Sequence, residues 1–321
     1  MMKKRVLLTG GAGFIGSHVV DVLIASGGYT VVVLDKLCYC ASKQNVNPAA
    51  IFELGDILEY ATVLGILEKH SIDVVMHFAA ETHVDNSFNN SVHFTHTNVV
   101  GTHVLLEAVR ANGRVEKFIH VSTDEVYGSP ADIESTDLFS EHASLLQPTN
   151  PYAASKAAAE MIVHAYKQSY KLPVVITRCN NVYGPRQYPE KIIPLFFKQV
   201  KAGKPLTLHG TGQNRRAYLY VTDAARAFLA VLEHGVTGQV YNIGRDEELT
   251  NLDVAQHILR HEPATAAGVV HVPDRTFNDT RYPLDLTKIR ALGWQPVVGW
   301  EAGLHSTLEW YKAHPGYFDK E

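Results

Sequence analysis

The chain has 321 residues, of which 46% are hydrophobic and 19% charged, so it can bury a sizeable core. Its 29 Lys and Arg and 33 Asp and Glu give a formal net charge of −4, which argues against sequence-independent nucleic-acid binding. No apolar run approaches the ~20 residues of a membrane span, and three cysteines are too few for a disulfide scaffold. We therefore expect a cytoplasmic protein with no nucleic-acid or membrane partner.

The first half of the chain alternates short β-branched segments with longer helical patterns. The segments expected to be strands are Arg5–Thr9, Thr30–Leu34, Ile51–Leu54, Asp73–Phe78, Lys117–Ser122 and Val174–Arg178. The helical patterns between them are Phe14–Ser26, Leu58–His70, Ser91–Asn112 and Pro151–Tyr170. Nearly continuous hydrophobicity is typical of strands buried on both faces of a parallel sheet. The alternation predicts a Rossmann-type, doubly wound α/β fold.

After Arg178 the pattern loosens, and Gly and Pro become frequent. Short strands are expected at Leu206–His209, Tyr218–Val221 and Val240–Ile243, with helices at Ile192–Lys201, Thr222–Glu233, Asn251–His261 and Trp300–Lys312. We expect residues 1–178 to form a dinucleotide-binding domain and residues 179–321 to form mainly a smaller substrate-binding lobe. Roughly residues 215–245 are expected to return to the first domain.

A glycine-rich turn joins the first expected strand to the first expected helix. Its spaced glycines are Gly10, Gly13 and Gly16. Gly10 permits a tight turn, Gly13 permits a pyrophosphate to approach the helix N-terminus, and Gly16 permits close packing of helix and sheet. A glycine triplet alone also fits an ordinary strand–helix turn. Here the flanking strand and helix, and an acidic residue at the right distance, favour nucleotide binding.

That acidic residue is Asp35, at the end of the second expected strand. A carboxylate there accepts hydrogen bonds from both adenosine ribose hydroxyls and repels a 2′-phosphate, which favours NAD over NADP. Lys36 weakens this inference, because a neighbouring cation tolerates the phosphate. Asp56 follows the third strand, where it is placed to bind an adenine amino group.

Tyr152 and Lys156 are four residues apart in an expected helix that begins with Pro151. Their side chains share one helical face and reach one site. A phenol with a pKa near 10 is a poor base at neutral pH, and a lysine ammonium and a positively charged nicotinamide beside it would lower that pKa. The phenolate could then take a hydroxyl proton. The spacing is also common by chance in amphipathic helices.

The segment Ser122–Glu125 closes the fifth expected strand. The carboxyl ends of parallel strands face the ligand crevice, so Thr123, Asp124 and Glu125 should point toward a cofactor. Adjacent half-buried carboxylates need partners or a proton, and such a pair supplies an acid and a base side by side. A helix-capping or turn cluster is the alternative.

The glycine turn and the Tyr152/Lys156 pair together resemble the extended short-chain dehydrogenase/reductase superfamily. Within it, Ser122–Gly128 resembles the nucleotide-sugar 4,6-dehydratases, since related epimerases and decarboxylases usually lack the Asp-Glu pair. The likeness is closest to the UDP-glucose 4,6-dehydratase domain of plant-type rhamnose synthases, and next to the bacterial dTDP-glucose enzymes. Further matching segments are His77–Asp85, Thr97–Thr102, Asn180–Pro185, Pro189–Pro194, Arg275–Tyr282 and Leu292–Trp294.

The resemblance implies a hydro-lyase that holds NAD and makes a 4-keto-6-deoxyglucose nucleotide for deoxysugar (rhamnose-type) biosynthesis. Tyr152 would deprotonate the glucose 4-hydroxyl while NAD⁺ takes hydride from C4. Glu125 would remove the acidified C5 proton, and Asp124 would protonate the 6-hydroxyl so that water leaves. Hydride would then return to C6 and a proton to C5. Thr123 would hydrogen-bond the 4-oxygen, and Lys156 the nicotinamide ribose.

The resemblance also implies the lining of two subsites. The NAD site would be lined by Gly10, Gly13, Phe14, Ile15, Gly16, Asp35, Lys36, Leu37, Cys38, Asp56, Ile57, Phe78, Ala79, Ala80, Thr82, Thr97, Tyr152, Lys156 and Val182. The nucleotide-sugar site would be lined by Thr82, Thr123, Asn181, Lys191, Ile192, Thr207, Leu208, His209, Arg216, Asn251, Arg275 and Asn278. Arg216 and Arg275 suit a pyrophosphate, because guanidinium binds phosphate oxygens bidentately.

Three questions stay open at this stage. The same scaffold serves nucleotide-sugar 4-epimerases and decarboxylases, and a non-catalytic dinucleotide-sensing module is a further alternative. Thr82, Val182, Ala217-Tyr218 and Asn278 depart from the usual bacterial pattern and lean toward UDP-sugars without deciding between uracil and thymine.

The remaining features concern metals, thiols and assembly. The chain has 17 histidines, but no Cys/His set has structural zinc spacing, so we expect no metal. Cys38-Tyr39-Cys40 is not a Cys-x-x-Cys motif. The helices Ser91–Asn112 and Pro151–Tyr170 are apolar on more than one face and must be covered. Related enzymes bury these helices between subunits, which implies a homodimer.

Overall fold

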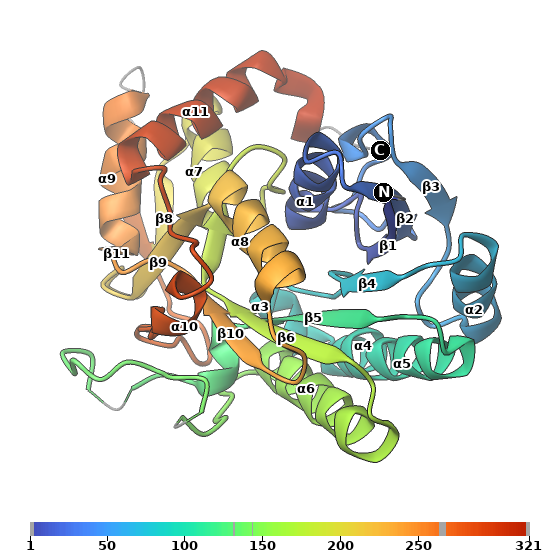
Figure 1. The fold of residues 1–321 in the computed structure, drawn as a ribbon. Coiled ribbons are helices and arrows are strands. Elements are labelled where there is room, and N and C mark those ends of the chain that lie inside the picture. The colour runs from blue at the N-terminus through green and yellow to red at the C-terminus, as the bar shows by residue number, and fades with distance from the viewer. Residues whose placement is uncertain (1–2, 131, 143, 263–267, 319–321) are drawn as a thin grey trace.

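The computed structural model describes residues 3–130, 132–142, 144–262 and 268–318. Within these residues, seven strands form one parallel sheet in the order β10-β6-β5-β4-β1-β2-β3 (Figure 1). The strands are β1 (Lys4–Thr9), β2 (Tyr29–Asp35), β3 (Ile51–Leu54), β4 (Val74–His77), β5 (Lys117–Thr123), β6 (Val174–Cys179) and β10 (Val240–Ile243). The predicted doubly wound fold is confirmed, and the six strands expected in the first half all lie in this sheet.

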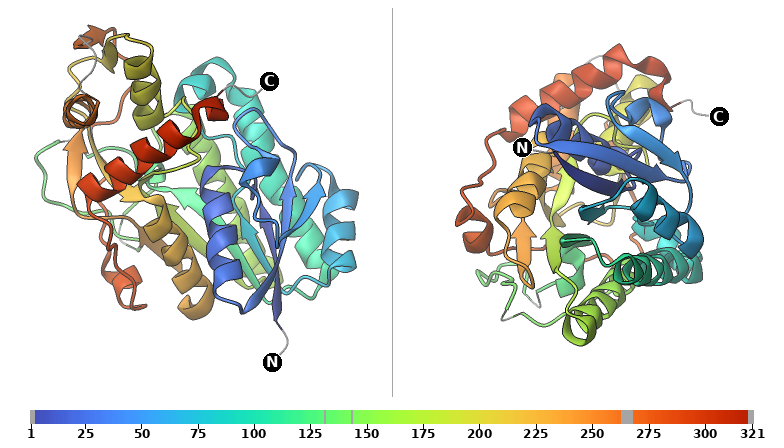
Figure 2. Two further views of the ribbon diagram at one scale, coloured as in Figure 1. Left: turned by 90° about the horizontal axis from the view of Figure 1, so that it is seen from above. Right: turned by 45° about the vertical axis from the view of Figure 1, so that its right-hand side comes forward.

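Helices cover both faces of the sheet, because its strands carry apolar side chains on both sides. On one face α1 (Phe14–Ala25) and α8 (Val221–His234) pack side by side, and Leu23 and Phe228 join the core there (Figure 2). On the other face lie α2 (Tyr60–Lys69), α5 (Gly101–Asn112) and α6 (Pro151–Tyr170), which bury Leu67, Leu105 and Val163.

The helix expected at Ser91–Asn112 is helical throughout but not uniform. After α3 (Val84–Asn89), the short α4 (Ser91–Phe94) continues into the π-helical segment η2 (Thr95–Val100) and then into α5. A wider turn inside a helix is frequent at functional sites. Here the wider turn contains Thr97, which faces the cleft described below.

The second lobe has its own core and two small sheets. One sheet has the order β11-β9-β7, from β11 (Glu248–Thr250), β9 (Arg215–Tyr220) and β7 (Asn181–Tyr183), and the other pairs β12 (Val269–Val272) with β8 (Leu206–His209). Its helices are α7 (Ile192–Lys201), α9 (Asn251–His261) and α11 (Trp300–Ala313), whereas α10 (Thr287–Arg290) packs against β10 of the large sheet. Phe196, Leu208 and Trp300 are buried in its core.

Residues 215–245 divide between the two lobes. The strand β10 pairs in parallel with β6, so this segment returns to the large sheet, and α8 packs on α1. The strand β9, expected at Tyr218–Val221, instead begins at Arg215 and pairs with β7 and β11 in the second lobe. Three 3-10 turns complete the described chain: η1 (Lys43–Asn45), η3 (Asp124–Tyr127) and η4 (Pro315–Phe318).

Two features of the described residues bear on possible ligands and surroundings. Among the helices of the described ranges, none combines the length and the apolar character that a membrane crossing requires. In the same ranges, no group of three or more His, Cys, Asp or Glu side chains is arranged to hold a metal ion.

Candidate active site

A cleft with a volume of about 270 Å³ opens at the carboxyl ends of β1, β2, β4, β5 and β6. Its walls come from the glycine turn after β1, the loop after β2, the start of η3, the first turns of α6 and the segment 179–191. Ligands of open parallel sheets bind at this edge, because the loops that follow the strands leave a crevice there.

The glycine turn leaves room for a ligand that a side chain would fill. Gly10 has a φ of +75°, and a Cβ on it would lie 2.6 Å from the backbone nitrogen of Ala79. A Cβ on Gly16 would lie 2.3 Å from the carbonyl oxygen of Gly10. Gly13 is the residue that precedes the first turn of α1, where unpaired N–H groups favour an anion. The turn therefore fits a dinucleotide pyrophosphate.

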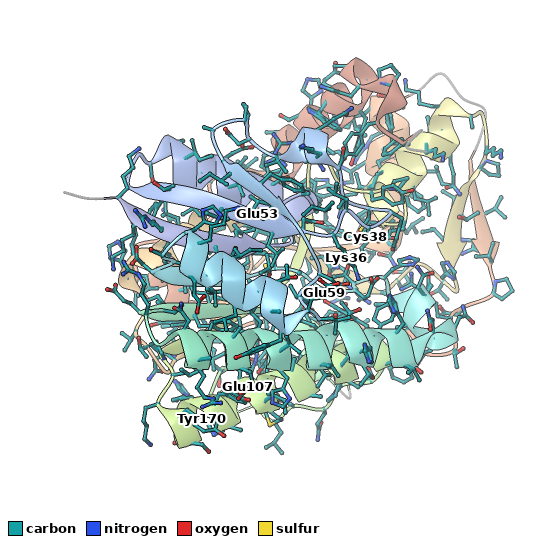
Figure 3. All side chains as sticks on the ribbon, turned by 90° about the vertical axis from the view of Figure 1, so that its right-hand side faces the viewer. Lys36, Cys38, Glu53, Glu59, Glu107 and Tyr170 are labelled. Carbon is teal, nitrogen blue, oxygen red and sulfur yellow. The ribbon has the colours of Figure 1, made fainter. Side chains whose placement is uncertain are left out.

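The Asp35 carboxylate is fixed by two backbone groups at the end of β2. It accepts hydrogen bonds from the N–H of Ala12 (2.9 Å) and of Leu37 (2.8 Å). Burial raises its pKa, and these hydrogen bonds oppose that rise. Lys36 forms an ion pair with Asp56 at 3.4 Å and lies beside Cys38 on the loop after β2 (Figure 3). Lys36 is therefore already paired with a carboxylate of the cleft.

The cleft also contains buried polar atoms without a partner among the described residues. The hydroxyl oxygens of Thr97 and Ser122 are buried, and neither has a hydrogen-bond partner there. Both residues line the cleft. Because a buried hydroxyl without a partner is costly, these atoms are suited to a polar ligand. Together with the glycine turn and Asp35, they fit a bound dinucleotide.

The helix α6 begins where the sequence predicts, and it brings Tyr152 and Lys156 to the cleft. Asn150 caps the helix by accepting a hydrogen bond from the N–H of Ala153 (2.9 Å), and Pro151 occupies the first turn. The Lys156 ammonium donates to the carbonyl oxygen of Val121 on β5 (2.6 Å). Burial lowers the pKa of Lys156 to about 8.

The phenol of Tyr152 has the opposite shift from the one expected. Burial raises the pKa of Tyr152 well above its usual range, and the charge of Glu125 raises it further, whereas a hydrogen bond with Thr123 lowers it. The charge of Lys156 is not among the influences that shift this pKa. The lowering that a base requires would therefore have to come from a positive charge that a bound cofactor supplies.

Asp124 and Glu125 form the start of η3, directly after β5. Asp124 accepts hydrogen bonds from the amide of Asn180 (2.7 Å) and the hydroxyl of Thr123 (3.0 Å). Glu125 accepts one from the amide of Asn150 (3.0 Å). Burial and the charge of Glu125 raise the pKa of Asp124 to about 7, and burial also raises the pKa of Glu125. The Asp124 carboxyl group is therefore protonated in a substantial fraction of the molecules near neutral pH.

A buried ion pair connects the two segments that carry Asp124, Glu125, Tyr152 and Lys156. The Arg178 guanidinium on β6 donates to the carboxylate of Glu160 on α6 (2.7 Å) and to the hydroxyl of Tyr127 in η3 (2.8 Å). The Tyr127 hydroxyl donates in turn to the side-chain oxygen of Asn242 on β10 (2.8 Å). Because each group is buried, these contacts fix α6 relative to η3.

Most of the residues expected to bind the cofactor or to catalyse the reaction line this one cleft. They are Gly10, Gly13, Phe14, Ile15, Gly16, Asp35, Lys36, Cys38, Asp56, Ile57, Phe78, Ala79, Ala80, Thr82, Thr97, Thr123, Asp124, Glu125, Tyr152, Lys156 and Val182. Leu37 is not among the described residues that line it. Its φ of +58° turns the loop, and its N–H holds Asp35.

The residues expected to bind the nucleotide sugar divide into two groups. Asn181 and Lys191 line the cleft with Thr82 and Thr123. The others lie outside the described cleft lining, and they are Ile192, Thr207, Leu208, His209, Arg216, Asn251, Arg275 and Asn278. Several of these side chains contact other protein groups. Arg275 pairs with Asp85 at 2.7 Å, the Asn278 amide donates to Asp274 (2.9 Å), and Arg216 donates to the carbonyl oxygen of Asp279 (3.0 Å).

Several residues in or beside the cleft were absent from the sequence-based prediction, and four of them have a clear place in the site. Asn150 and Asn180 hold the two carboxylates, and Tyr188 and Glu190 belong to the cleft wall. Asn150 precedes a proline that begins a helix, so its capping position was readable from the sequence, but its second bond to Glu125 was not. Asn180 follows β6 directly, at the same sheet edge as Asp124.

Comparison with known proteins decides the family. A sequence profile of the NAD dependent epimerase/dehydratase family matches residues 6–244. The chain belongs to this family. Two relatives, one from a plant and one from a mammal, have the same sequence identity to this chain. A trifunctional UDP-glucose 4,6-dehydratase/3,5-epimerase/reductase of Arabidopsis thaliana is 49% identical over 98% of this chain and 48% of its own length. The dTDP-D-glucose 4,6-dehydratase of Mus musculus is 49% identical over 96% of this chain and 89% of its own length.

The fold of this chain also matches that of a solved structure. The crystal structure of dTDP-glucose 4,6-dehydratase from Streptomyces venezuelae, which has NAD bound, shares 41% identity and has a TM-score of 0.92 over 98% of this chain and 99% of that one. The chain spans about half the length of the trifunctional plant relatives that it matches.

Proposed function

We propose that this family member is a nucleotide-sugar 4,6-dehydratase that converts UDP-glucose or dTDP-glucose to the 4-keto-6-deoxyglucose nucleotide. The observation that carries the proposal is the adjacent pair of the buried Asp124 and the partly buried Glu125, which shares one cleft with Tyr152 and Lys156. An epimerase has no water to expel and needs no such pair. The dehydratase names of relatives near half identity support the same activity.

The cofactor proposed for the cleft is NAD. The glycine turn would hold its pyrophosphate, the Asp35 carboxylate its adenosine ribose, and Lys156 its nicotinamide ribose. When bound, NAD accepts the hydride of sugar carbon 4 and returns it to carbon 6. Because Lys36 is paired with Asp56, it would attract a 2′-phosphate more weakly than an unpaired lysine would. We therefore expect NAD to bind more tightly than NADP.

Oxidation at carbon 4 needs a base for the 4-hydroxyl proton. Tyr152 would accept that proton, and the Thr123 hydroxyl would hydrogen-bond the 4-oxygen. Lys156 lines the same cleft as Tyr152, and its bond to Val121 fixes its position. The resulting 4-ketone acidifies the hydrogen on carbon 5, which is otherwise unreactive.

Loss of water then needs one acid and one base on the same side of the sugar. Asp124, with its pKa raised to about 7, retains a proton that it would give to the 6-hydroxyl. Glu125 would take the proton from carbon 5. Burial raises the pKa of Glu125, and the Asn150 amide and the charges of Arg216 and Lys191 oppose that rise, which favours its ionised, basic form. After water leaves, Glu125 would return the proton to carbon 5.

The second lobe is proposed to bind the nucleotide. Arg216 and Arg275 would contact the pyrophosphate, and residues 207–209 with Asn251 and Asn278 would surround the base and ribose. The Arg275–Asp85 pair spans the two lobes, so a substrate phosphate would have to replace Asp85 as the partner of Arg275. This division corresponds to a cofactor domain over residues 1–178 with β10, and a substrate lobe over most of 179–321.

The proposed reaction is tested by incubating the NAD-loaded protein with UDP-glucose and, separately, with dTDP-glucose. We expect a 4-keto product, which is detected by the absorbance of its enolate in alkali and by mass spectrometry as loss of one water. UDP-galactose without any keto sugar would contradict the dehydratase assignment and favour the epimerase. The ratio of kcat/KM for the two substrates gives the base preference. The plant relatives favour the UDP-sugar and a role in rhamnose formation.

A homodimer is proposed through the face formed by α4, η2, α5 and α6. Val92, Val100, Met161 and Tyr170 are exposed there, at 75%, 39%, 54% and 51%. Figure 3 shows Tyr170 on α6 beside Glu107 on the neighbouring α5. Apolar residues gathered on adjoining helices are typical of a subunit interface.

The dimer is tested by light scattering coupled to size-exclusion chromatography. Met161→Glu should shift the mass of the protein from two chains to one. The matched control is Val297→Glu, since Val297 is 64% exposed on the loop before α11, away from these helices. A wild-type protein that elutes as one chain at micromolar concentration would contradict the proposal. We also propose a cytoplasmic location, which suits three cysteines that are all free thiols.

A further inference from the structure

Two thiols that the reaction does not use face each other in the cleft wall. The sulfur atoms of Cys38 and Cys40 are 3.5 Å apart on the loop after β2, and both residues line the cleft. Both are only partly buried, and Figure 3 shows Cys38 on this loop beside Lys36. The described residues hold one other cysteine, Cys179, which is buried.

The surroundings of the pair favour reaction at Cys38. A hydrogen bond from the Cys40 thiol lowers the pKa of Cys38, and a hydrogen bond from the Cys40 backbone N–H lowers it further. Partial exposure admits a small oxidant, and the thiolate is the form that reacts. Cys179 is different, because burial raises the pKa of its thiol well above the usual range. The hydrogen bond between the Cys38 and Cys40 thiols, together with burial, raises the pKa of the Cys40 thiol. Cys38 is therefore the reactive thiol, Cys40 is the neighbour that can resolve its oxidised form, and Cys179 is inert.

The residue between the two thiols bridges the lobes. The Tyr39 hydroxyl donates to the carboxylate of Glu190 at 2.6 Å, and the Tyr39 ring meets the edge of the Tyr188 ring with centroids 5.4 Å apart. The next residue, Lys191, donates to the carbonyl oxygen of Thr82 (2.8 Å). We call the Tyr39–Glu190 contact the clasp. It joins the cofactor loop to the segment that leads into the substrate lobe.

We propose that Cys38 and Cys40 are an oxidation site, at which a peroxide or a low-molecular-weight disulfide forms a reversible Cys38–Cys40 disulfide that releases the clasp and lowers turnover. The disulfide itself rests on the thiol geometry alone. Its effect on turnover rests on the proposed function, because it assumes that the loop borders the bound cofactor and substrate.

The step balances with hydrogen peroxide as the oxidant. The Cys38 thiolate attacks one peroxide oxygen, the O–O bond breaks, and a sulfenic acid and one water form once protons are supplied. The Cys40 thiol then attacks the Cys38 sulfur, so that the S–S bond forms and a second water leaves. Two thiols lose two electrons, and the peroxide gains them. A dithiol reductant reverses the reaction by thiol–disulfide exchange.

Closing the bond must move the loop. The sulfur atoms would approach from 3.5 Å to about 2.05 Å, in a ring that contains the whole backbone of Tyr39. The ring restricts the φ and ψ angles of Tyr39, whose side chain must reach across the cleft to meet Glu190. We therefore expect the oxidised loop to lose the clasp and to hold substrate more weakly.

The first arm of the test detects the bond without using activity. The NAD-loaded protein with Cys179→Ser is treated with hydrogen peroxide, and its free thiols are then alkylated. After proteolysis, the mass of the peptide that carries residues 38–40 is measured by mass spectrometry. We expect a peptide lighter by two hydrogens and unblocked at both cysteines, restored by dithiothreitol. Cys40→Ser is the matched control, and it should give only the sulfenic acid or its higher oxides at Cys38. If the peptide with residues 38–40 from the oxidised Cys179→Ser protein lacks the internal disulfide, the proposal is overturned.

The second arm asks what the bond does, with each protein compared with its own reduced form. Oxidation should lower the kcat/KM of the Cys179→Ser protein about tenfold, mainly through KM, since one charge-assisted contact is lost. Tyr39→Phe should show a raised KM when reduced, and oxidation should lower its kcat/KM much less, because the clasp is already gone. An equal fall in both proteins would overturn the clasp mechanism. A reduced wild-type protein without dehydratase activity would instead contradict the proposed function and leave the first arm intact.

Discussion

The two sides of the cleft are built differently. On the sheet side, Asp35, Asp124, Glu125 and Lys156 are each held by hydrogen bonds to neighbouring backbone or amide groups, and Asp124 and Lys156 are buried. On the lobe side, Arg275 is bonded to an aspartate of the opposite lobe. In the proposed reaction, the sheet side is preorganised for catalysis, whereas the lobe side would have to exchange protein partners for substrate.

This difference separates chemistry from affinity. A group already fixed in the geometry of the reaction contributes to kcat, because little reorganisation is left at the moment of reaction. A group that must give up an ion pair to meet the substrate contributes mostly to binding. Substitutions on the sheet side should therefore change kcat, and those on the lobe side should change KM.

The largest effect is expected for Tyr152→Phe. The variant lacks the base for the 4-hydroxyl proton, so turnover of the nucleotide sugar should fall about 10³-fold or more. The assay is formation of 4-keto product, with retained cofactor measured by absorbance. Tyr170→Phe, at the exposed end of the same helix, should keep wild-type turnover. A normal kcat in Tyr152→Phe would contradict the claim that groups on the sheet side of the cleft contribute to kcat.

Glu125→Gln should block the second half of the reaction and leave the first. Oxidation at carbon 4 should proceed, but loss of the carbon 5 proton should slow about 10²-fold, so reduced cofactor should accumulate and be visible by absorbance. Glu134→Gln, an exposed carboxylate paired with Arg215, is the control. Wild-type turnover in Glu125→Gln would show that another group is the carbon 5 base.

The water-loss step should depend on pH through Asp124. Its pKa is raised to about 7 by burial and by Glu125, so the acid form predominates below pH 7, and the rate should fall as pH rises through that value. Asn180 donates to the ionised form and so lowers this pKa. Asn180→Ala should therefore move the fall to higher pH, in single-turnover measurements of water loss.

The exposed Asn89→Ala is the control for this pH profile, and its profile should match the wild type. A shift of the Asn180→Ala profile to lower pH would contradict the assigned sign. An unchanged profile would show that another group supplies the proton.

The smallest effect is expected on the lobe side. Arg275→Ala removes one proposed phosphate contact and should raise KM for the nucleotide sugar about tenfold, with kcat nearly unchanged. Steady-state kinetics of the NAD-loaded protein provide the test, with Arg290→Ala, an exposed residue paired with Asp246, as the control. A fall in kcat with unchanged KM would place Arg275 on the catalytic side of the comparison.

The sheet was predictable because each of its strands is identified by the hydrophobic pattern of neighbouring residues. Each strand in the first half is a β-branched run, and the carboxyl-end rule places Gly10, Asp35 and Asp124 at one edge without knowledge of strand order. The expected ends of the six strands of the first half differ from the observed ends by at most one residue. The turn after β1 and the cap of α6 likewise depend on residues that are close together in the sequence.

The second lobe was less predictable because its contacts are distant in sequence. The short strands β7, β11 and β12 form through pairing with β9 and β8, so their own residues carry little signal. The bond between Asn180 and Asp124 joins residues 56 apart, and the Arg275–Asp85 contact joins residues 190 apart. The raised pKa of Tyr152 depends on its burial against Glu125, which the helical spacing of Tyr152 and Lys156 does not reveal.

The most direct measurement follows two hydrogens through a single turnover. The substrate is UDP-glucose or dTDP-glucose that carries deuterium at carbon 4, and a second sample uses unlabelled substrate in deuterated water. We predict that the carbon 4 deuterium appears at carbon 6 of a 4-keto-6-deoxy product, and that solvent deuterium appears at carbon 5. A product that keeps its deuterium at carbon 4, with no solvent label at carbon 5, would show that no water is eliminated and contradict the account.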